Sequence, residues 1–238
     1  MEAYQDLLPV LDAITAKLHK TRGTLRIYDP YFCAGGMVAR LASLGFTSVH
    51  NPCEDFYRVV KENRLPDFDV LVTNPPYSSD HPARLIEFVK QCGKPWALLM
   101  PNWVYMKEYY DRAIQGAIYV APRKRYYYWT PKALKRAKHT HSGPMGERTS
   151  PFISFWYIGP GGFQDAIVRQ WGKVGGRRET SGASKETSEK HATLCLSTAR
   201  LPPGAMDMND PNRCRAKNTL KRERSGGGGG YHRAKKRG

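Results

Sequence analysis

A short apolar strand that ends in Asn-Pro-Pro-Tyr constrains the fold of this chain more than any other feature. Residues 68–73 (Phe-Asp-Val-Leu-Val-Thr) are mostly apolar and β-branched, which predicts a buried strand. Residues 74–77 then place a side-chain amide, two prolines of fixed φ and an aromatic ring at its carboxyl end. Ligands bind at this edge in open α/β sheets. An amide oxygen beside a ring that stacks on a base suits chemistry on a planar amino group.

Strands and helices alternate along the first 160 residues. The spacing of apolar residues predicts helices over 5–19, 37–44, 56–62, 82–91 and 105–115. Short apolar runs predict strands over 25–28, 46–50, 68–73, 96–100, 117–121 and 152–158. Such alternation is typical of an α/β fold with a parallel sheet and helices on both faces. We expect an N-terminal helix (residues 1–22) packed on a domain of residues 23–171.

The chain is strongly basic, and its charge is concentrated toward the C-terminus. The net charge is +17 over 238 residues, and residues 173–238 carry 16 Lys and Arg against 6 Asp and Glu. Because residues 172–238 are rich in Gly, Ser, Lys and Arg, we expect a disordered basic tail there. The charge indicates a polyanion such as nucleic acid as partner. A solvated tail with no dedicated partner is the alternative.

Other features limit the compartment and the cofactors. The five cysteines are scattered without a CxxC or Cys/His cluster, so we expect a reducing compartment and no metal site. No apolar run reaches membrane-spanning length, and acidic residues near the N-terminus argue against a signal or transit peptide. We expect a soluble intracellular protein, in the nucleus or the cytoplasm. The basic clusters at 221–224 and 233–237 would suit a nuclear address.

A second motif follows the first predicted strand. Residues 29–36 (Asp-Pro-Tyr-Phe-Cys-Ala-Gly-Gly) join that strand to a predicted helix. An acidic residue followed by glycines is typical of a nucleotide-type cofactor loop, because glycines permit close approach of the backbone. The segment lacks the GxGxxG spacing of a dinucleotide loop. A simple tight turn is the alternative.

Taken together, the two motifs resemble those of class I S-adenosylmethionine-dependent methyltransferases that act on amino groups, including adenine-N6 enzymes. The resemblance covers residues 4–160. It implies a Rossmann-like fold with a mostly parallel seven-stranded sheet and S-adenosylmethionine as cofactor. It also implies that the amino group is held by Asn74, Pro75, Pro76 and Tyr77. The cofactor would be bound by Asp29, Pro30, Tyr31, Cys33, Gly35, Gly36, Asn51, Glu54, Asp55 and Phe56.

This chain departs from the family pattern at two places. Its loop is one residue longer, and Ala34 stands where the central glycine is expected. The acid that bonds the ribose after the second strand is left open among Asn51, Glu54 and Asp55. By resemblance, Asp55 and Phe56 would hold the adenine of the cofactor. Alternatively, Asp55 caps the helix that begins near Phe56.

The chemistry expected of Asn74 follows from the weakness of an adenine amino group as a nucleophile. Hydrogen bonds from its N–H groups to the Asn74 side-chain oxygen and the Pro75 carbonyl would disperse the positive charge that develops during methyl transfer. Pro76 offers no competing N–H donor. Tyr77 would stack on the base. The alternative is a rigid turn with an ordinary surface tyrosine.

A basic, aromatic-rich insertion over residues 120–150 favours a nucleic acid as the substrate. We expect Asn102, Trp103, Arg123, Lys124, Arg125 and Tyr126 to contact it, cations on phosphates and rings on bases. Two of the insertion's tyrosines could instead lie in the core as part of a strand. The leading hypothesis is adenine-N6 methylation of RNA or DNA. A protein glutamine-N5 methyltransferase and an inactive nucleic-acid-binding module are the alternatives, and a partner subunit is left open.

Overall fold

The strands form one mixed seven-stranded sheet. The computed structural model describes residues 1–111, 114, 116–122, 125–126, 153–175 and 192–196. The strand order is β2-β1-β3-β4-β6-β5-β7. The strands are β1 (Ile27–Tyr28), β2 (Val49–His50), β3 (Val70–Thr73), β4 (Trp96–Pro101), β5 (Ile118–Pro122), β6 (Ser154–Gly159) and β7 (Ala192–Cys195).

The sheet is parallel on one side and antiparallel on the other. Strands β2, β1, β3 and β4 pair in parallel, whereas β6 runs antiparallel to both of its neighbours, β4 and β5. Five strands therefore run in one direction, and only β6 and β7 oppose them. This arrangement confirms the predicted Rossmann-like α/β class.

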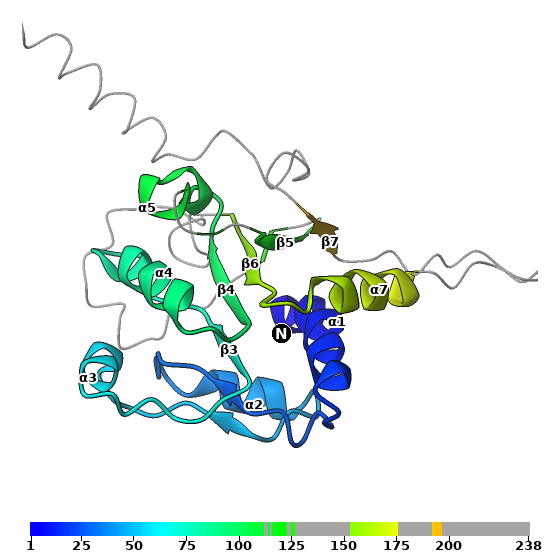
Figure 1. The fold of residues 1–238 in the computed structure, drawn as a ribbon, viewed down its shortest axis with the longest axis horizontal. Helices are drawn as coiled ribbons and strands as arrows, with labels where there is room; N and C mark the ends of the chain where they lie inside the picture. The colour runs from blue at the N-terminus through cyan, green and yellow to red at the C-terminus, as the bar shows by residue number, and fades with distance from the viewer. Residues whose placement is uncertain (112–113, 115, 123–124, 127–152, 176–191, 197–238) are drawn as a thin grey trace, which may run out of the picture. The chain divides into compact units, whose positions relative to one another are not determined.

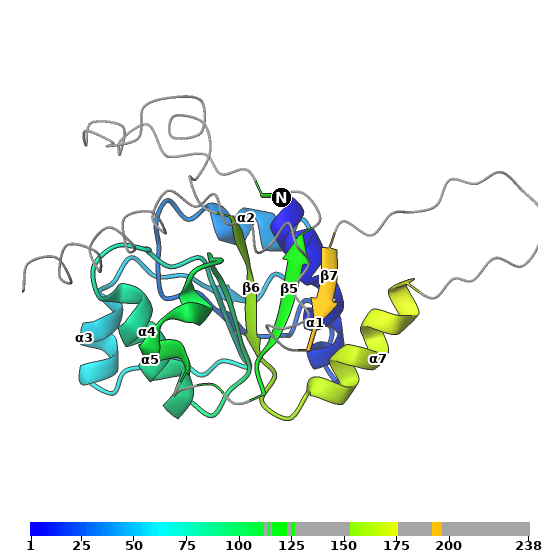
Figure 2. The ribbon, with the colours of Figure 1, turned by 90° about the horizontal axis from the view of Figure 1, so that it is seen from above.

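Helices cover both faces of the sheet (Figures 1 and 2). On one face lie α1 (Glu2–Lys17), α2 (Gly36–Ala42) and α7 (Gln164–Gly175), and α1 packs against α7. On the other lie α3 (Phe56–Lys61), α4 (His81–Gln91) and α5 (Glu108–Asp111). A short 3₁₀ helix, η1 (Val104–Met106), precedes α5, where a single helix over 105–115 was predicted.

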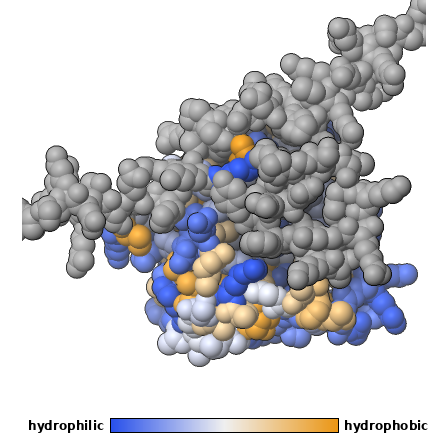
Figure 3. All heavy atoms as spheres, turned by 180° about the vertical axis from the view of Figure 1, so that it is seen from behind, coloured by the Kyte–Doolittle hydropathy of each residue, from blue (hydrophilic) through white to orange (hydrophobic). Residues whose placement is uncertain are grey.

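The alternation of side chains along each strand explains the two cores. Val70 and Val72 of β3 face the layer of α1, whereas Leu71 between them faces the layer of α4. Because both faces are buried, the central strands need apolar residues at successive positions. Strands β3, β4 and β6 are buried along their whole length, which is why their apolar runs predicted them. In Figure 3, small hydrophobic groups on the face seen from behind are interspersed with hydrophilic residues.

The N-terminal helix shares the core of the sheet and is tied to it by polar contacts. The Trp156 indole N–H donates to the Ala3 carbonyl at 2.7 Å. The Tyr126 hydroxyl donates to the Asp6 carboxylate at 2.7 Å, and both side chains are buried. The prediction that Tyr126 contacts a nucleic acid is therefore wrong, and the alternative of a core tyrosine holds for this residue.

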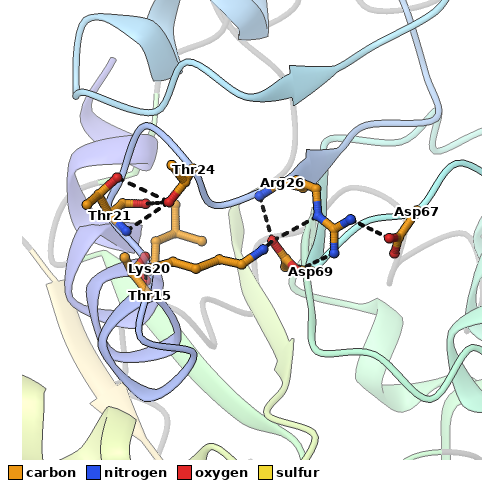
Figure 4. A network of polar contacts seen from close by, with 8 residues as sticks. Thr15, Lys20, Thr21, Thr24, Arg26, Asp67 and Asp69 are labelled. Carbon is orange, nitrogen blue, oxygen red and sulfur yellow. Dashed lines mark hydrogen bonds and ion pairs between the residues drawn. The ribbon is translucent and has the colours of Figure 1, made fainter.

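A network of charges binds the segment after α1 to the start of β3 (Figure 4). Asp69 lies at its centre and accepts hydrogen bonds from the Lys20 ammonium at 2.5 Å and from the Arg26 backbone N–H at 2.8 Å. The Arg26 guanidinium contacts Asp69 as well as Asp67. This network lies at the amino ends of β1 and β3, opposite the edge where residues 74–77 lie.

The C-terminal boundary of the predicted domain is wrong. Helix α7 continues to Gly175, and β7 at residues 192–195 pairs with β5, so ordered structure enters the tail predicted for residues 172–238. Residues 176–191 and 197–238 lie outside the described residues, as does most of the insertion. The insertion predicted over 120–150 also begins too early, because β5 extends to Pro122. Among the described helices, none has the length and apolar character needed to cross a bilayer.

Candidate functional site at the carboxyl ends of the strands

The structure brings the two sequence motifs together at one edge of the sheet. Strand β1 ends at Tyr28, directly before Asp29, and its parallel neighbour β3 ends at Thr73, directly before Asn74. The Thr73 hydroxyl donates to the Asp29 carboxylate at 2.6 Å. Loop 29–36 and residues 74–77 therefore begin side by side, although more than forty residues separate them in the sequence.

Asp29 is a buried carboxyl group with a raised pKa. Burial raises its pKa to about 7, against the opposing effects of the Thr73 hydroxyl and the Tyr31 backbone N–H, which both bond to the carboxylate. The backbone N–H of Asp29 donates to the His50 carbonyl of β2 at 2.9 Å. Asp29 is thus fixed between three strands and can carry a proton near neutral pH.

Loop 29–36 turns sharply before it enters α2. Pro30 is buried, Tyr31 is half-buried, and Phe32, Cys33 and Ala34 are exposed. Gly35 has φ of +65°, and a Cβ at this position would approach the Phe32 ring to 3.3 Å, so the turn requires glycine. Cys33 also has a positive φ and is a free, exposed cysteine. The segment from Phe32 to Gly36 thus leaves its backbone close to the surface.

Asn51 holds the end of the loop from the neighbouring strand. Its side-chain N–H₂ group donates to the carbonyls of Asp29 at 3.1 Å and Tyr31 at 3.3 Å. Its side-chain oxygen is buried and meets no hydrogen-bond partner within the described part of the chain. Asn51 therefore supports the loop through its nitrogen and presents an unused acceptor oxygen.

The other residues predicted after the second strand have structural contacts. Asp55 caps α3, since its carboxylate accepts from the backbone N–H groups of Tyr57 at 2.9 Å and Arg58 at 3.3 Å. This is the capping role considered for it above. Phe56 is buried in the core and packs edge-to-face on Phe88 with ring centroids 5.0 Å apart. Glu54 forms an exposed ion pair with Arg64.

Residues 74–77 combine an exposed amide with a ring that is anchored to the sheet. Asn74 and Pro76 are exposed, and Pro75 is buried. The half-buried Tyr77 points its hydroxyl to the Asn74 side-chain oxygen and to the Leu99 carbonyl of β4, 3.1 Å away. Burial raises the pKa of Tyr77 above its ordinary value. The Tyr77 hydroxyl thus contacts the same Asn74 oxygen that the sequence predicted to accept a hydrogen bond from an amino group.

The carboxyl end of β4 contributes a further wall. Asn102 is buried, and its backbone N–H donates to the Ile153 carbonyl at 2.8 Å, just before β6 begins. Trp103 is half-buried, and the Lys107 ammonium lies 5.3 Å from the centre of its ring. Arg125 is half-buried, and Arg123 and Lys124 lie outside the described residues. The structure thus places Asn102 and Trp103 at the predicted edge.

Sequence reasoning missed several polar residues beside this edge. Thr73 links the two motifs, but the sequence pattern marks it only as a β-branched residue of a strand. Tyr57, His81 and Arg84 form a cluster with Tyr31, in which hydroxyl and imidazole groups are hydrogen-bonded. Their positions on two different helices follow no motif, so only the position of α4 directly after residues 74–77 could have drawn attention to His81.

A cavity of about 790 Å³ lies at the opposite edge of the sheet. Its lining includes Trp96 at the start of β4, Gly159 at the end of β6, and the loop before α7. Of the predicted cofactor and substrate residues that the structure describes, none lines it. The cavity is therefore distinct from the carboxyl-edge site.

The fold and this edge define a Rossmann-like α/β protein with a polar site at the carboxyl ends of β1, β3 and β4. Neither a protein-family model nor a curated protein sequence matches the chain. Among solved structures it is similar to the crystal structure of a probable spermidine synthase from Corynebacterium glutamicum ATCC 13032, with 14% identity and a TM-score of 0.38. The similarity covers 77% of this chain and 81% of that chain.

Proposed function

We propose that the protein is an S-adenosylmethionine-dependent methyltransferase that acts on an exocyclic amino group, namely adenine N6 of RNA or DNA. The observation that carries the proposal is the hydrogen bond between Thr73 and Asp29, with the adjacent parallel pairing of β1 and β3. It supports a single site made of loop 29–36 and residues 74–77. An acidic loop with an exposed backbone thereby lies beside an exposed amide.

The residues at this edge suit the proposed cofactor. The buried side-chain oxygen of Asn51 lacks a partner among the described residues and would accept a hydrogen bond from a ribose hydroxyl. Asp29 and the open backbone at Gly35 and Gly36 would complete the contacts on the loop side. When bound, S-adenosylmethionine supplies an electrophilic methyl group.

On the acceptor side, Asn74 would orient the amino group. Its exposed side-chain oxygen would accept from the N–H₂ group in place of the Tyr77 hydroxyl, and the Pro75 carbonyl would accept the second N–H. These bonds favour the charged transition state, because the nitrogen gains positive charge as it forms the new bond. Tyr77 would then offer its ring, held near β4 by the Leu99 carbonyl, as a surface for the base.

The position of the basic insertion supports a nucleic acid as the substrate. The insertion leaves β5 after Pro122 and returns to β6 at Ser154, which pairs with Pro101 at the carboxyl end of β4. Both of its described ends thus lie near Asn102. The insertion carries many Lys and Arg residues in its sequence, and such residues near the site would bind phosphates.

The proposal is tested with purified full-length protein and S-adenosylmethionine carrying a labelled methyl group. We expect label to appear as N6-methyladenosine or its deoxy form after incubation with RNA or DNA. The Asn74→Ala variant should lose transfer while its affinity for S-adenosylmethionine, measured by calorimetry, stays within about twofold of wild type. Gln91→Ala, an exposed amide at the end of α4, is the matched control and should transfer normally.

Three results would contradict the proposal. Label transferred to a glutamine side chain of a protein, and not to nucleic acid, would favour the glutamine-N5 alternative. Nucleic-acid binding without any cofactor binding would favour an inactive binding module. Loss of cofactor binding in Asn74→Ala would show that this residue supports the fold of the site and does not act on the acceptor.

A further inference from the structure

Three polar side chains from three different segments form a hydrogen-bonded chain beside the site. The Tyr31 hydroxyl of loop 29–36 lies 2.9 Å from the Tyr57 hydroxyl of α3. The Tyr57 hydroxyl lies 2.8 Å from Nδ1 of His81, the first residue of α4. All three side chains are half-buried. The chain therefore joins the cofactor-side loop to the helix that begins four residues after Tyr77.

Ring packing holds this chain in place. The rings of Tyr57 and His81 stack with centroids 5.5 Å apart and an interplanar angle of 25°. The Arg84 guanidinium carbon lies 3.4 Å from the centre of the Tyr57 ring, on the helix that carries His81. The Tyr31 ring meets that of His81 edge-on, with centroids 6.3 Å apart. The hydroxyl of Tyr57 is thus fixed between its two neighbours.

We propose that Tyr57 and His81 are positioning residues, which hold Tyr31 and with it loop 29–36 against the start of α4. The inference rests on the proposed function, because it is the methyl-transfer site whose two halves they align. The bond from Thr73 to Asp29 joins the base of loop 29–36 to the end of β3, and Asn51 holds the carbonyls of Asp29 and Tyr31. The hydroxyl chain adds a contact from the Tyr31 side chain to α4, the helix that follows residues 74–77. This further contact restricts the orientation of the loop relative to that helix.

The direction of the chain depends on the charge of His81. When His81 is neutral with Nδ1 as acceptor, Tyr57 donates to it and Tyr31 donates to Tyr57. When His81 is protonated, Nδ1–H donates to Tyr57, and Tyr57 in turn donates to Tyr31. The charged groups around the cluster are Arg84, which packs on Tyr57, the carboxylates of Asp80 and Asp55, which act on Tyr57, and that of Asp29, which acts on Tyr31. Protonation of His81 therefore alters the hydrogen bonding of Tyr31 without changing its partner.

The first experiment measures this connection without any cofactor. The Asp29 carboxylate accepts from the Tyr31 N–H, so all spectra are compared at one pH. In NMR spectra we expect His81→Phe to shift the amide resonances of residues 32–35. In a Tyr57→Phe background the same substitution should leave those resonances unchanged, because the chain is already broken. Loop resonances that ignore His81→Phe, or that shift equally in the Tyr57→Phe background, would overturn the proposal.

The second experiment measures the affinity for S-adenosylhomocysteine by calorimetry. Tyr57→Phe and His81→Phe should each raise the Kd about fivefold, the effect of one lost hydrogen bond of about 1 kcal/mol. The double variant should also lie near fivefold, because either change breaks the same chain. His81→Asn, whose amide oxygen can replace Nδ1 as acceptor, should restore most of the affinity.

A matched control is available in the core. Tyr110 and Tyr119 form another hydroxyl pair at 2.9 Å, outside loop 29–36 and residues 74–77, and Tyr110→Phe should leave the Kd within about twofold of wild type. Independent, multiplying effects of Tyr57→Phe and His81→Phe would overturn the proposal. Failure of wild type to bind S-adenosylhomocysteine would refute the proposed function, and the NMR comparison of the variants would still decide whether His81 positions the loop.

Discussion

The hydroxyl of Thr73 donates to the carboxylate of Asp29 at 2.6 Å, and this bond connects the ends of two parallel strands. Asp29 begins the acidic loop, and Thr73 precedes the exposed amide of Asn74. Because the bond is buried, it is shielded from competition with water. The sheet and this side-chain hydrogen bond therefore set the relative position of the two motifs.

The raised pKa of Asp29 predicts a pH-dependent stability. Its pKa is about 7 in the folded protein and near its ordinary 3.8 when unfolded, so between these values the folded state holds one more proton. The stability should therefore fall as the pH rises from about 4 to 7, by on the order of 3 kcal/mol from this group. Asp29→Asn, which keeps an acceptor oxygen, should remove this component in urea titrations across that range. Identical pH profiles for both proteins would contradict it.

Tyr77 should act through its ring and not through its hydroxyl. The hydroxyl contacts the Asn74 side-chain oxygen, which the amino group would use, so Tyr77→Phe removes a competitor and keeps the ring. We expect its transfer rate to stay within about threefold of wild type. Tyr77→Ala should lose about 10- to 100-fold, since stacking of one base contributes about 1–3 kcal/mol. Equal losses in both variants, measured as kcat/KM on nucleic acid, would assign the role to the hydroxyl.

The central strands were predicted well because burial on both faces gives them continuous apolar runs in the sequence. Strands β3 and β4 are buried on both faces, and their uninterrupted apolar runs lie within one or two residues of the predicted bounds. The predicted strands at 25–28 and 46–50 shrink to two paired residues each, since pairing depends on neighbours far along the chain. Strand β7 was missed for the same reason: its four residues pair with β5, some seventy residues away.

Helix α7 illustrates a different limit. Phe163, Ile167 and Trp171 recur at helical spacing and all pack on the core with α1, yet Gly172 and the basic residues beyond it suggested a tail. Packing against α1 outweighs the low helix propensity of glycine near the end.

Within the site, both motifs were identified from the sequence, but the Tyr31–Tyr57–His81 chain was not. Its members come from three segments, and only the tertiary fold brings them together.

The charge network at the amino ends of the strands should contribute unequally through its two carboxylates. The Asp69 side chain is 8% exposed, and that of Asp67 is 71% exposed, although both contact Arg26. Burial acts to raise the pKa of Asp69, but the hydrogen bonds from Arg26 and Lys20 outweigh it and lower the pKa. Asp69→Ala should therefore cost about 2 kcal/mol, and Asp67→Ala less than about 0.5 kcal/mol.

Chemical denaturation at pH 7 tests this difference. Because the folded-state pKa of Asp69 is lowered, its contribution is present at neutral pH and is lost as the pH falls below the ordinary 3.8. The gap between wild type and Asp69→Ala should thus narrow in acid. Equal costs for the two variants at pH 7 would show that burial does not distinguish the two carboxylates.

Gly159 should tolerate no side chain, because Trp96 packs directly on its backbone. The two residues are paired across β4 and β6, and a Cβ at Gly159 would lie 2.0 Å from the Trp96 ring. Gly159→Ala must displace the buried indole and should lower the free energy of unfolding by about 1–3 kcal/mol. In a Trp96→Leu background, the same change should cost clearly less, because the shorter side chain leaves room for the methyl group.

Gly172 in α7 is the matched control for this substitution. A Cβ there would meet nothing within 4 Å, so Gly172→Ala should stabilise the protein by about 0.5–1 kcal/mol through helix propensity. Urea denaturation followed by Trp fluorescence measures both variants, and Trp96 also reports the displaced indole in Gly159→Ala. A neutral Gly159→Ala would contradict this prediction. It would mean that the Trp96 ring does not lie where a Cβ of residue 159 would meet it at 2.0 Å, and that the register of Trp96 with Gly159 differs.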